Sequence, residues 1–366
     1  MKIKKTINLK RFTYLTAGLM ALMAVSVSCE EEDITDDGNN ENPEDLAGIY
    51  IANEGNFGNS DASISFINPE SYEITNKVFQ NANGRELGDI LQDVYFTDNQ
   101  KAYLVVNNSK KVEVVDSETF ESIGVLTGVD YPRQFEQVSP DKGYLTNGSS
   151  ATGEAGKVYI INLIKNEITD SIMVGEGPES MAVGEDYVYV ANSGGYNQDS
   201  TVFVIDKSMH QTVDTIKVGN IPFDIEIDNQ GDIWVFCKGL GSWQTGGPTN
   251  SKLVKINQND FSTTFYDIGK TGSYGYYLLA TDKNKDNIYY VGADGVYKMG
   301  ISDNQVPASP VINKVPYGID VNPDNDEIFL TVSNYSSKGF VFRYDTDHSI
   351  IDSTEVGYNP NAVVFN

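Results

Sequence analysis

The sequence has little cysteine and histidine and few basic residues, and each shortage argues against a class of protein. Two cysteines cannot build a disulfide scaffold, and two histidines cannot supply a metal site rich in imidazole. Only 26 of the 366 residues are Lys or Arg against 52 Asp or Glu, a formal net charge of −26. Nucleic-acid binding and adsorption to an anionic membrane surface both need clustered cations, so neither is expected. The 40% hydrophobic and 11% aromatic residues that remain are typical of a folded chain.

Residues 1–28 have the pattern of an export signal. A basic stretch that ends at Arg11 is followed by an apolar run from Leu15 to Val27. The run is too short for a stable membrane span and ends in small residues before Cys29. The segment Ser26–Cys29 resembles a bacterial lipobox, whose cysteine is lipidated and becomes the mature N-terminus. We therefore predict a signal peptide over 1–28 and lipidation at Cys29, with ordinary secretion and a coincidental cysteine as the alternative.

Residues 29–45 are acidic, rich in Asn and without periodicity, which predicts a flexible, self-repelling tether. Acidic residues directly after the lipid-bearing cysteine resemble the surface-export signals of Bacteroidetes lipoproteins. This resemblance implies an outer-membrane lipoprotein that faces the cell exterior and contacts the membrane only through its lipid anchor. The second cysteine, Cys237, lies in the apolar run 233–237, so we expect a small buried residue and not a nucleophile.

From residue 46 to the end, a short strand pattern recurs seven times. The copies are 49–53, 103–107, 143–147, 188–192, 233–237, 288–292 and 328–334. Each has two partner strands after it and a short strand before it, which often starts after a proline. Four short strands per unit, rich in β-branched and aromatic residues, are typical of a propeller blade. We predict that residues 46–366 form an all-β, seven-bladed β-propeller with four-stranded blades and no helix; a tandem of sandwiches would not explain seven equivalent copies.

The first copy has no inner strand before it, because the acidic stretch 36–45 cannot form one. The apolar segment 358–365 at the C-terminus has the pattern of the missing strand. We expect this segment to complete the first blade and close the ring without open sheet edges.

Several motifs resemble known propellers. The Tyr-Val-x-Asn strand ends, the turns Ser139–Gly143 and Asn322–Asp324, and the Gly-x-Pro strand openings resemble YVTN-repeat propellers. The segments Asn53–Gly58, Gln80–Arg85 and Val105–Ser109 resemble surface lipoproteins of gut Bacteroidetes that are associated with cobalamin uptake. The resemblance implies a protein that binds a corrinoid and passes it to an outer-membrane TonB-dependent transporter.

The long loops predict which face of the propeller binds a ligand. Loops from strand 2 to strand 3 and from one blade to the next share one rim; here they are long and aromatic, whereas those of the opposite rim are short turns. The candidate ligand-binding residues are Asn53, Asn56, Phe57, Arg85, Tyr131, Arg133, Tyr196, Trp243, Tyr274, Tyr276, Tyr317, Tyr335 and Tyr358. Aromatic bodies with polar tips suit a large amphipathic ligand with amides, such as a corrinoid, or an oligosaccharide. The Asn that recurs at the strand ends either serves the ligand or only caps its strand.

We expect no enzyme activity and no cofactor. His210 and His348 fall in equivalent short turns on the opposite face, and no nucleophile stands beside a base. The segment Asp282–Asp286 has the spacing of the start of a calcium loop, but Ala293 stands where a bidentate Glu belongs, so we favour a solvated turn. The alternative functions are a surface protein-interaction or glycan-binding propeller and, third, a propeller lyase or hydrolase.

Overall fold

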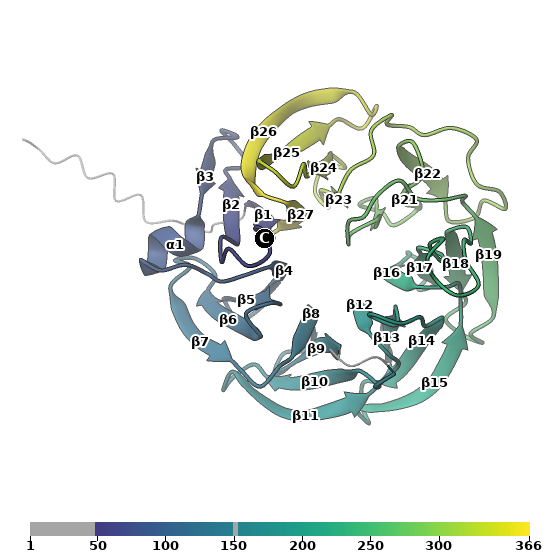
Figure 1. The fold of residues 1–366 in the computed structure, drawn as a ribbon, viewed down its shortest axis with the longest axis horizontal. Helices are drawn as coiled ribbons and strands as arrows, with labels where there is room; N and C mark the ends of the chain where they lie inside the picture. The colour runs from purple at the N-terminus through teal and green to yellow at the C-terminus, as the bar shows by residue number, and fades with distance from the viewer. Residues whose placement is uncertain (1–47, 149–152) are drawn as a thin grey trace, which may run out of the picture. The chain divides into compact units, whose positions relative to one another are not determined.

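The computed structural model describes residues 48–148 and 153–366. The predicted signal peptide, the predicted lipidation site Cys29 and the predicted tether lie outside the described residues. Seven antiparallel sheets follow one another around a central axis (Figure 1), so the predicted seven-bladed β-propeller is confirmed. In the part of the chain described, no helix is long and apolar enough to cross a membrane.

The strands of the first four sheets run outward from the axis in the order given. The first sheet is β27 (Pro360–Phe365), β1 (Ile49–Asn53), β2 (Ser63–Ile67) and β3 (Ile74–Asn76). The second is β4 (Leu91–Thr97), β5 (Lys101–Val106), β6 (Lys111–Asp116) and β7 (Ser122–Leu126). The third is β8 (Tyr131–Ser139), β9 (Lys142–Gly148), β10 (Lys157–Asn162) and β11 (Glu167–Met173). The fourth is β12 (Pro178–Val183), β13 (Tyr187–Asn192), β14 (Thr201–Asp206) and β15 (Gln211–Lys217).

The remaining three sheets complete the ring. The fifth is β16 (Pro222–Ile227), β17 (Ile233–Cys237), β18 (Lys252–Ile256) and β19 (Thr263–Asp267). The sixth is β20 (Leu279–Thr281), β21 (Asn287–Val291) and β22 (Val296–Gly300). The seventh is β23 (Gly318–Val321), β24 (Ile328–Val332), β25 (Lys338–Tyr344) and β26 (Ile350–Tyr358).

Two local features differ from the sequence prediction. The sixth blade has three strands, and only the bridge between Val296 and Ile312 marks the place of a fourth. Pro307 and Pro310 lie in that segment, and a proline has no N–H for a ladder hydrogen bond. The loop after β3 contains a short helix, α1 (Val78–Asn83), which buries Phe79 and ends at the left-handed Gly84.

The blades close by the predicted pairing of the two ends of the propeller. β1 lies between β2 and β27, and it pairs with β27 from Ile49 opposite Phe365 to Asn53 opposite Pro360 (Figure 1). All five residues of β1 are buried. Because β27 satisfies the inner edge of β1, the described propeller has no open inner strand at the junction of its ends.

A partial ring of polar side chains joins five of the seven pairs of neighbouring inner strands around the axis. Each of these side chains reaches a backbone group of the neighbouring blade. The contacts are Asp93 to Phe135, Gln134 to Met181, Asp224 to Leu278 and Leu279, Asp320 to Val363, and Asn361 to Gln92. Strand pairing within blades cannot supply these bonds, so this ring, together with apolar packing between sheets, holds the blades in register.

Candidate functional site

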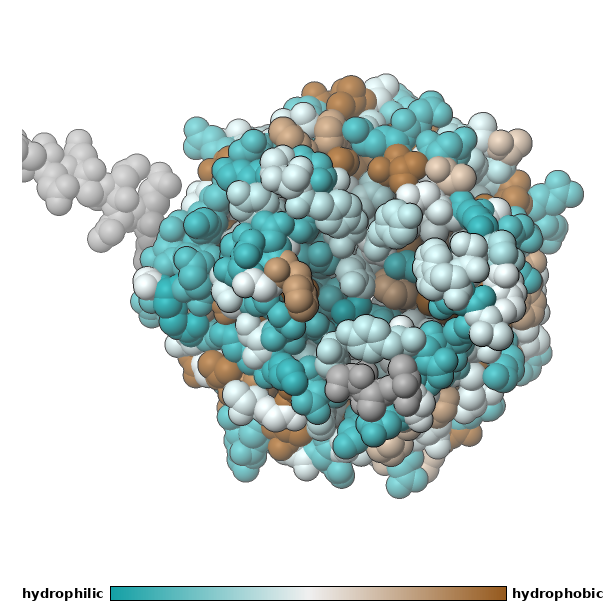
Figure 2. Space-filling view, viewed as in Figure 1, coloured by the Kyte–Doolittle hydropathy of each residue, from teal (hydrophilic) through white to brown (hydrophobic). Residues whose placement is uncertain are grey.

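A cavity of about 440 Å³ opens on the face that carries the long loops. The same face is hollowed near its centre in Figure 2. We call this space the rim cavity. It is lined by Glu54, Phe57, Ile90, Gln92, Asn107, Asn108, Tyr131, Arg133, Gly148, Gly177, Pro178, Glu179, Ser193, Gly195, Tyr196, Ile221, Phe223 and Tyr276. Its walls therefore come from the loops after strand 2 and from the starts of the innermost strands, as the sequence predicted for the ligand face.

The start of each inner strand places one side chain at the axis. In five blades a proline opens or precedes this strand, and in four of them the residue after the proline faces the channel or its wall. These residues are Arg133 after Pro132, Glu179 after Pro178, Phe223 after Pro222 and Tyr317 after Pro316. Proline suits a strand start because it needs no ladder partner there, and its fixed φ holds the next residue in place.

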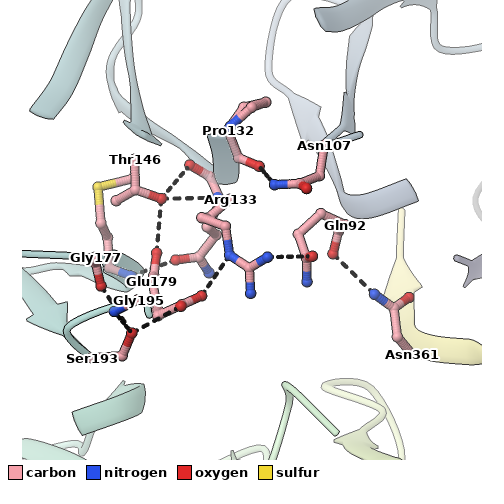
Figure 3. Close-up of polar contacts among 12 residues, drawn as sticks. Gln92, Asn107, Pro132, Arg133, Thr146, Gly177, Glu179, Ser193, Gly195 and Asn361 are labelled. Atoms are coloured by element: carbon pink, nitrogen blue, oxygen red, sulfur yellow. Dashed lines mark hydrogen bonds and ion pairs between the residues drawn. The ribbon is translucent and has the colours of Figure 1, made fainter. Parts of the chain in front are cut away.

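Arg133 and Glu179 form a partly buried ion pair in the cavity wall. Arg133 Nε donates to Glu179 Oε2 at 2.6 Å, and an Nη of Arg133 donates to Gln92 Oε1 at 2.9 Å (Figure 3). Ser193 Oγ donates to the other carboxylate oxygen of Glu179 at 3.0 Å. Burial opposes the charge on Arg133, but Glu179 beside it keeps the pKa of the guanidinium above its ordinary value. The guanidinium therefore stays charged, and hydrogen bonds with Gln92 and Ser193 hold the pair in place.

Aromatic rings hold the cations of the site. The guanidinium carbon of Arg133 lies 4.6 Å from the centre of the Tyr276 ring. Lys238 Nζ lies 3.2 Å from the centre of the Phe223 ring and donates to the carbonyl of Gly275 at 2.7 Å. Burial lowers the pKa of Lys238 to about 7, against the neighbouring carboxylates, which raise it. The aromatic walls thus serve as cation–π partners as well as apolar surface.

Glu54 is the buried carboxylate of the rim cavity. Only 6% of the residue is exposed, and Tyr317 Oη donates to its Oε2 at 3.0 Å. Its other oxygen, Oε1, is buried and has no hydrogen-bond partner among the described residues. Burial raises the pKa of Glu54 to about 7, although the bond from Tyr317 and the charges of Arg133 and Lys238 lower it. An unpaired oxygen on a buried carboxylate is costly, and in native sites it usually marks a missing partner.

A second cavity of about 400 Å³ lies further along the channel. We call it the acidic chamber, because Glu136, Asp224, Glu226 and Asp320 line it together with the single cation Lys285. Burial raises the pKa of each of the four carboxyls, to about 6 for Asp224 and about 7 for Glu226. A narrow neck lined by residues of both cavities separates it from the rim cavity. No group of three or more His, Cys, Asp or Glu in the described part of the chain is arranged to hold a metal ion.

The structure brings five of the predicted ligand residues together in the rim cavity: Phe57, Tyr131, Arg133, Tyr196 and Tyr276. The hydroxyls of Tyr131 and Tyr196 lie 3.5 Å apart, with the two rings at right angles.

Two more predicted tyrosines adjoin the rim cavity through Glu54. Tyr317 bonds to Glu54, and the ring of Tyr335 packs edge-on against that of Tyr317. Trp243 and Tyr274 do not line the cavity, and both are about four-fifths exposed. They can meet only a ligand or partner that extends over the rim.

The other four predicted residues make structural contacts. Arg85 pairs with Glu113 in the second blade, away from the cavity lining. Asn56 bonds to Asp61 in its own loop, and the carbonyl of Tyr358 accepts from Gly55 N.

Asn53 is buried and serves the sheet. It donates to the carbonyls of Ile51 and Ser63 and to Ser65 Oγ, and it accepts from Gly357 N. Its contacts are those of a residue that caps its strand, which was the alternative explanation of the recurrent Asn.

The remaining motifs of the sequence lie away from the rim cavity. Asp282 accepts bonds from Asp286 N and Asn287 N, so its carboxylate closes the turn between β20 and β21. His210 Nδ1 lies 2.6 Å from Tyr144 Oη, and His348 packs beside Tyr289. Cys237 is buried, as predicted, and burial raises the pKa of its thiol to about 12.

Sequence reasoning missed Glu54, Gln92, Glu179, Phe223 and Lys238. Glu54 lies between the predicted ligand residues Asn53 and Asn56, but a lone Glu in an acidic chain carries no signal. Glu179 and Phe223 had a usable signal, because each directly follows a proline that opens an inner strand. Aligning the blades on that proline would have placed both at the channel.

Comparisons with known proteins agree with this architecture. The family described as "Domain of unknown function (DUF5074)" matches residues 47–366. None of the curated proteins matches the sequence. A solved quinonprotein alcohol dehydrogenase-like protein from Bacteroides thetaiotaomicron superposes with a TM-score of 0.64 at 14% identity, over 87% of this chain and 78% of that one. The periplasmic gluconolactonase of Pseudomonas aeruginosa gives 0.63 at 12% identity, over 87% and 98%. At such identities the likeness shows the fold alone.

Proposed function

We propose that the chain, which belongs to the DUF5074 family of domains of unknown function, is a capture protein that binds a small organic molecule in its rim cavity without converting it. The observation that carries the proposal is the rim cavity itself. Its volume of about 440 Å³ falls within the usual range for ligand pockets. Phe57, Tyr131, Tyr196, Phe223 and Tyr276 give it apolar walls, and a few fixed polar groups converge on it.

The charges of the site favour a ligand that is neutral and amphipathic. The carboxyls of Glu54 and Glu179 line the cavity beside the cation Arg133, and Lys238 lies close enough to Glu54 to lower its pKa. These opposite charges offset one another, so a ligand with a net charge gains little. Aromatic faces and polar edges suit a ring system that carries amides. A corrinoid has this chemistry, and the sequence resemblance to cobalamin-associated lipoproteins supports it.

Size decides how a corrinoid would sit. The macrocycle with its side chains is larger than the rim cavity, so we expect it to lie across the mouth with one edge inserted. In that position the exposed rings of Trp243, Tyr274 and Tyr335 border the ligand. In this arrangement the exposed rings outside the cavity contact the ligand, whereas a ligand small enough to fit inside the cavity would not reach them.

The cellular setting of the proposal follows from the N-terminal pattern alone. We propose an outer-membrane lipoprotein, anchored through Cys29, that passes its ligand to a TonB-dependent transporter. A flexible acidic tether would let the propeller reach such a partner while the acidic domain stays off the anionic surface.

A desalting experiment tests the proposed ligand. Purified protein is mixed with cyanocobalamin and passed over the column, and we expect visible absorbance in the protein peak. Tyr276→Ala should weaken retention because it removes a cavity wall and the ring under Arg133. Phe265→Ala is the control, since this half-exposed aromatic lies on the outer strand β19. A colourless protein peak from the unmodified chain would exclude a corrinoid as the ligand.

One observation favours a second candidate, a hydrolase or lyase. Glu54 and Lys238 both have pKa values of about 7, which suits general acid–base work at neutral pH. The gluconolactonase among the structural neighbours makes lactones the first substrates to try. Turnover of a lactone panel that is lost in Glu54→Gln would favour this candidate over simple capture.

A further inference from the structure

The unpaired oxygen of Glu54 shows where the rim cavity lacks a partner. Glu54 lines the cavity, Tyr317 occupies its Oε2, and Oε1 has no partner among the described residues. The backbone on either side is fixed, because Glu54 N donates to the carbonyl of Asn359 and its carbonyl accepts from Leu91 N. The carboxylate is therefore held in place with one acceptor unused.

The charges nearby restrict what can supply the missing donor. Arg133 stays charged and lies close enough to lower the pKa of Glu54, so a cationic group would meet a like charge there. An anionic group would meet Glu54 itself and Glu179. A neutral group that carries an N–H avoids both penalties.

Arg133 offers the complementary half of the contact. Its guanidinium has five N–H groups. One bonds to Glu179 and one to Gln92, and the ring of Tyr276 lies under the plane. Its other N–H groups are not used by these two bonds, and Arg133 and Glu54 both line the rim cavity.

We propose that Glu54 and Arg133 form a subsite for a primary carboxamide, in which Glu54 Oε1 accepts an amide N–H and Arg133 donates to the amide carbonyl. The inference rests on the proposed function, since it names the group by which the captured ligand is recognised. It makes Glu54 the specificity-determining residue of the rim cavity. Carboxylate and ammonium analogues of the same shape are rejected by charge, and a tertiary amide is rejected because it has no N–H.

Four fragments of one shape test the subsite. Benzamide, benzoate, benzylamine and N,N-dimethylbenzamide are titrated against the full protein at pH 8, with binding followed by ligand-observed NMR. Benzamide should bind at least about tenfold more tightly than each of the others, the ratio expected for one hydrogen bond to a charged group. In Glu54→Leu this preference should disappear.

Further variants keep the test decisive. Glu54→Gln preserves the shape and one oxygen but loses the charge, so benzoate should approach benzamide in affinity even if Glu54→Leu fails to fold. Glu113→Gln is the matched control, because Glu113 is a buried carboxylate whose partners are Arg85 and Lys111. It should leave the fragment preference unchanged.

The outcomes separate the subsite from the proposed function. Equal binding of all four fragments, or a preference that survives in the Glu54 variants, overturns the carboxamide subsite. Cyanocobalamin is run beside the fragments on the same samples. If cyanocobalamin fails to bind but the amide preference holds, the proposal of a corrinoid ligand is wrong and the carboxamide subsite stands. If cyanocobalamin binds the parent and the Glu54 variants equally and the fragments show no preference, the subsite is wrong and capture stands.

Discussion

Replacing Glu226 by Gln should stabilise the propeller at alkaline pH and leave its stability unchanged in acid. Glu226 lies in the acidic chamber near Asp224, with Lys285 as the only cation of the lining. Burial raises its pKa from 4.5 to about 7, and the charge of Asp224 adds to the effect. The folded protein therefore holds this proton more tightly than the unfolded chain does.

The sign and size of the change in stability with pH follow from the difference in the pKa of Glu226 between the folded and unfolded states. Below pH 4.5 the carboxyl is protonated in both states, and its contribution to stability is fully present. As the pH rises through 7, the folded state must ionise a buried group, and the contribution is lost. A pKa of about 7 in place of 4.5 corresponds to roughly 3 kcal/mol at pH 8. With an unfolding entropy near 2.1 cal/mol/K per residue, a domain of this size should shift in Tm by about 4 °C.

Thermal unfolding of the parent and of Glu226→Gln from pH 4 to pH 8 measures the effect. The advantage of the variant should be near zero at pH 4 and grow to about 4 °C at pH 8. Glu185→Gln is the control, because this Glu is exposed in the turn between β12 and β13; its difference from the parent should not change with pH. A Glu226→Gln advantage that is constant from pH 4 to pH 8 would refute the reasoning.

Three other substitutions or deletions test the framework of the site. Arg133→Ala should lower the free energy of unfolding by about 3 kcal/mol, because it removes the ion-pair partner of the largely buried Glu179. Chemical denaturation measures the loss, and adding Glu179→Gln to this variant should restore part of it. Gly177→Ala should cost roughly 2 kcal/mol in the same assay, since Gly177 has φ +59° and a Cβ there would lie 2.1 Å from Gly195 N; a neutral result would mean that the loop moves freely. Deleting residues 360–366 removes the strand that pairs with β1, so gel filtration should show aggregation through the open edge, and a monomer of unchanged Tm would contradict strand closure.

The blades could be found from the sequence because their second strands are buried on both faces. All of Ile49–Asn53 is buried, and so is all of Ile233–Cys237. Such continuous burial requires the apolar, β-branched runs that repeat along the chain. The closing strand β27 could also be predicted. The first blade has no inner strand before β1, so the apolar C-terminal segment must supply it.

The lining of the channel could not be found in this way, because the inner strands are irregular. The pairing of β8 with β9 shifts register between Pro132 and Phe135, and that of β12 with β13 shifts between Pro178 and Met181. A bulge of this kind breaks the alternation of period two, so simple strand patterns misplace the side chains beyond it. Arg133 lines the rim cavity while Glu136, three residues later, lines the acidic chamber.

The partners of single polar residues also depend on loops that only the fold brings together. Asn53 and Arg133 are both polar residues at strand ends of the ligand face, yet the first serves the sheet and the second the cavity. Sequence alone left both possibilities open for the recurrent Asn. The distinction lies in whether a backbone group of the same blade stands within reach, which no local pattern encodes.

The construction of the channel explains how binding can be tuned without disturbing the fold. Side chains such as Asp93 and Asp224 accept from backbone N–H groups of the next inner strand. Glu179 and Phe223, which follow opening prolines, line the rim cavity. Glu179 also joins two blades through its ion pair with Arg133. Substitution of Phe223 therefore changes the shape of the rim cavity without removing an inter-blade hydrogen bond, whereas substitution of Glu179 removes one.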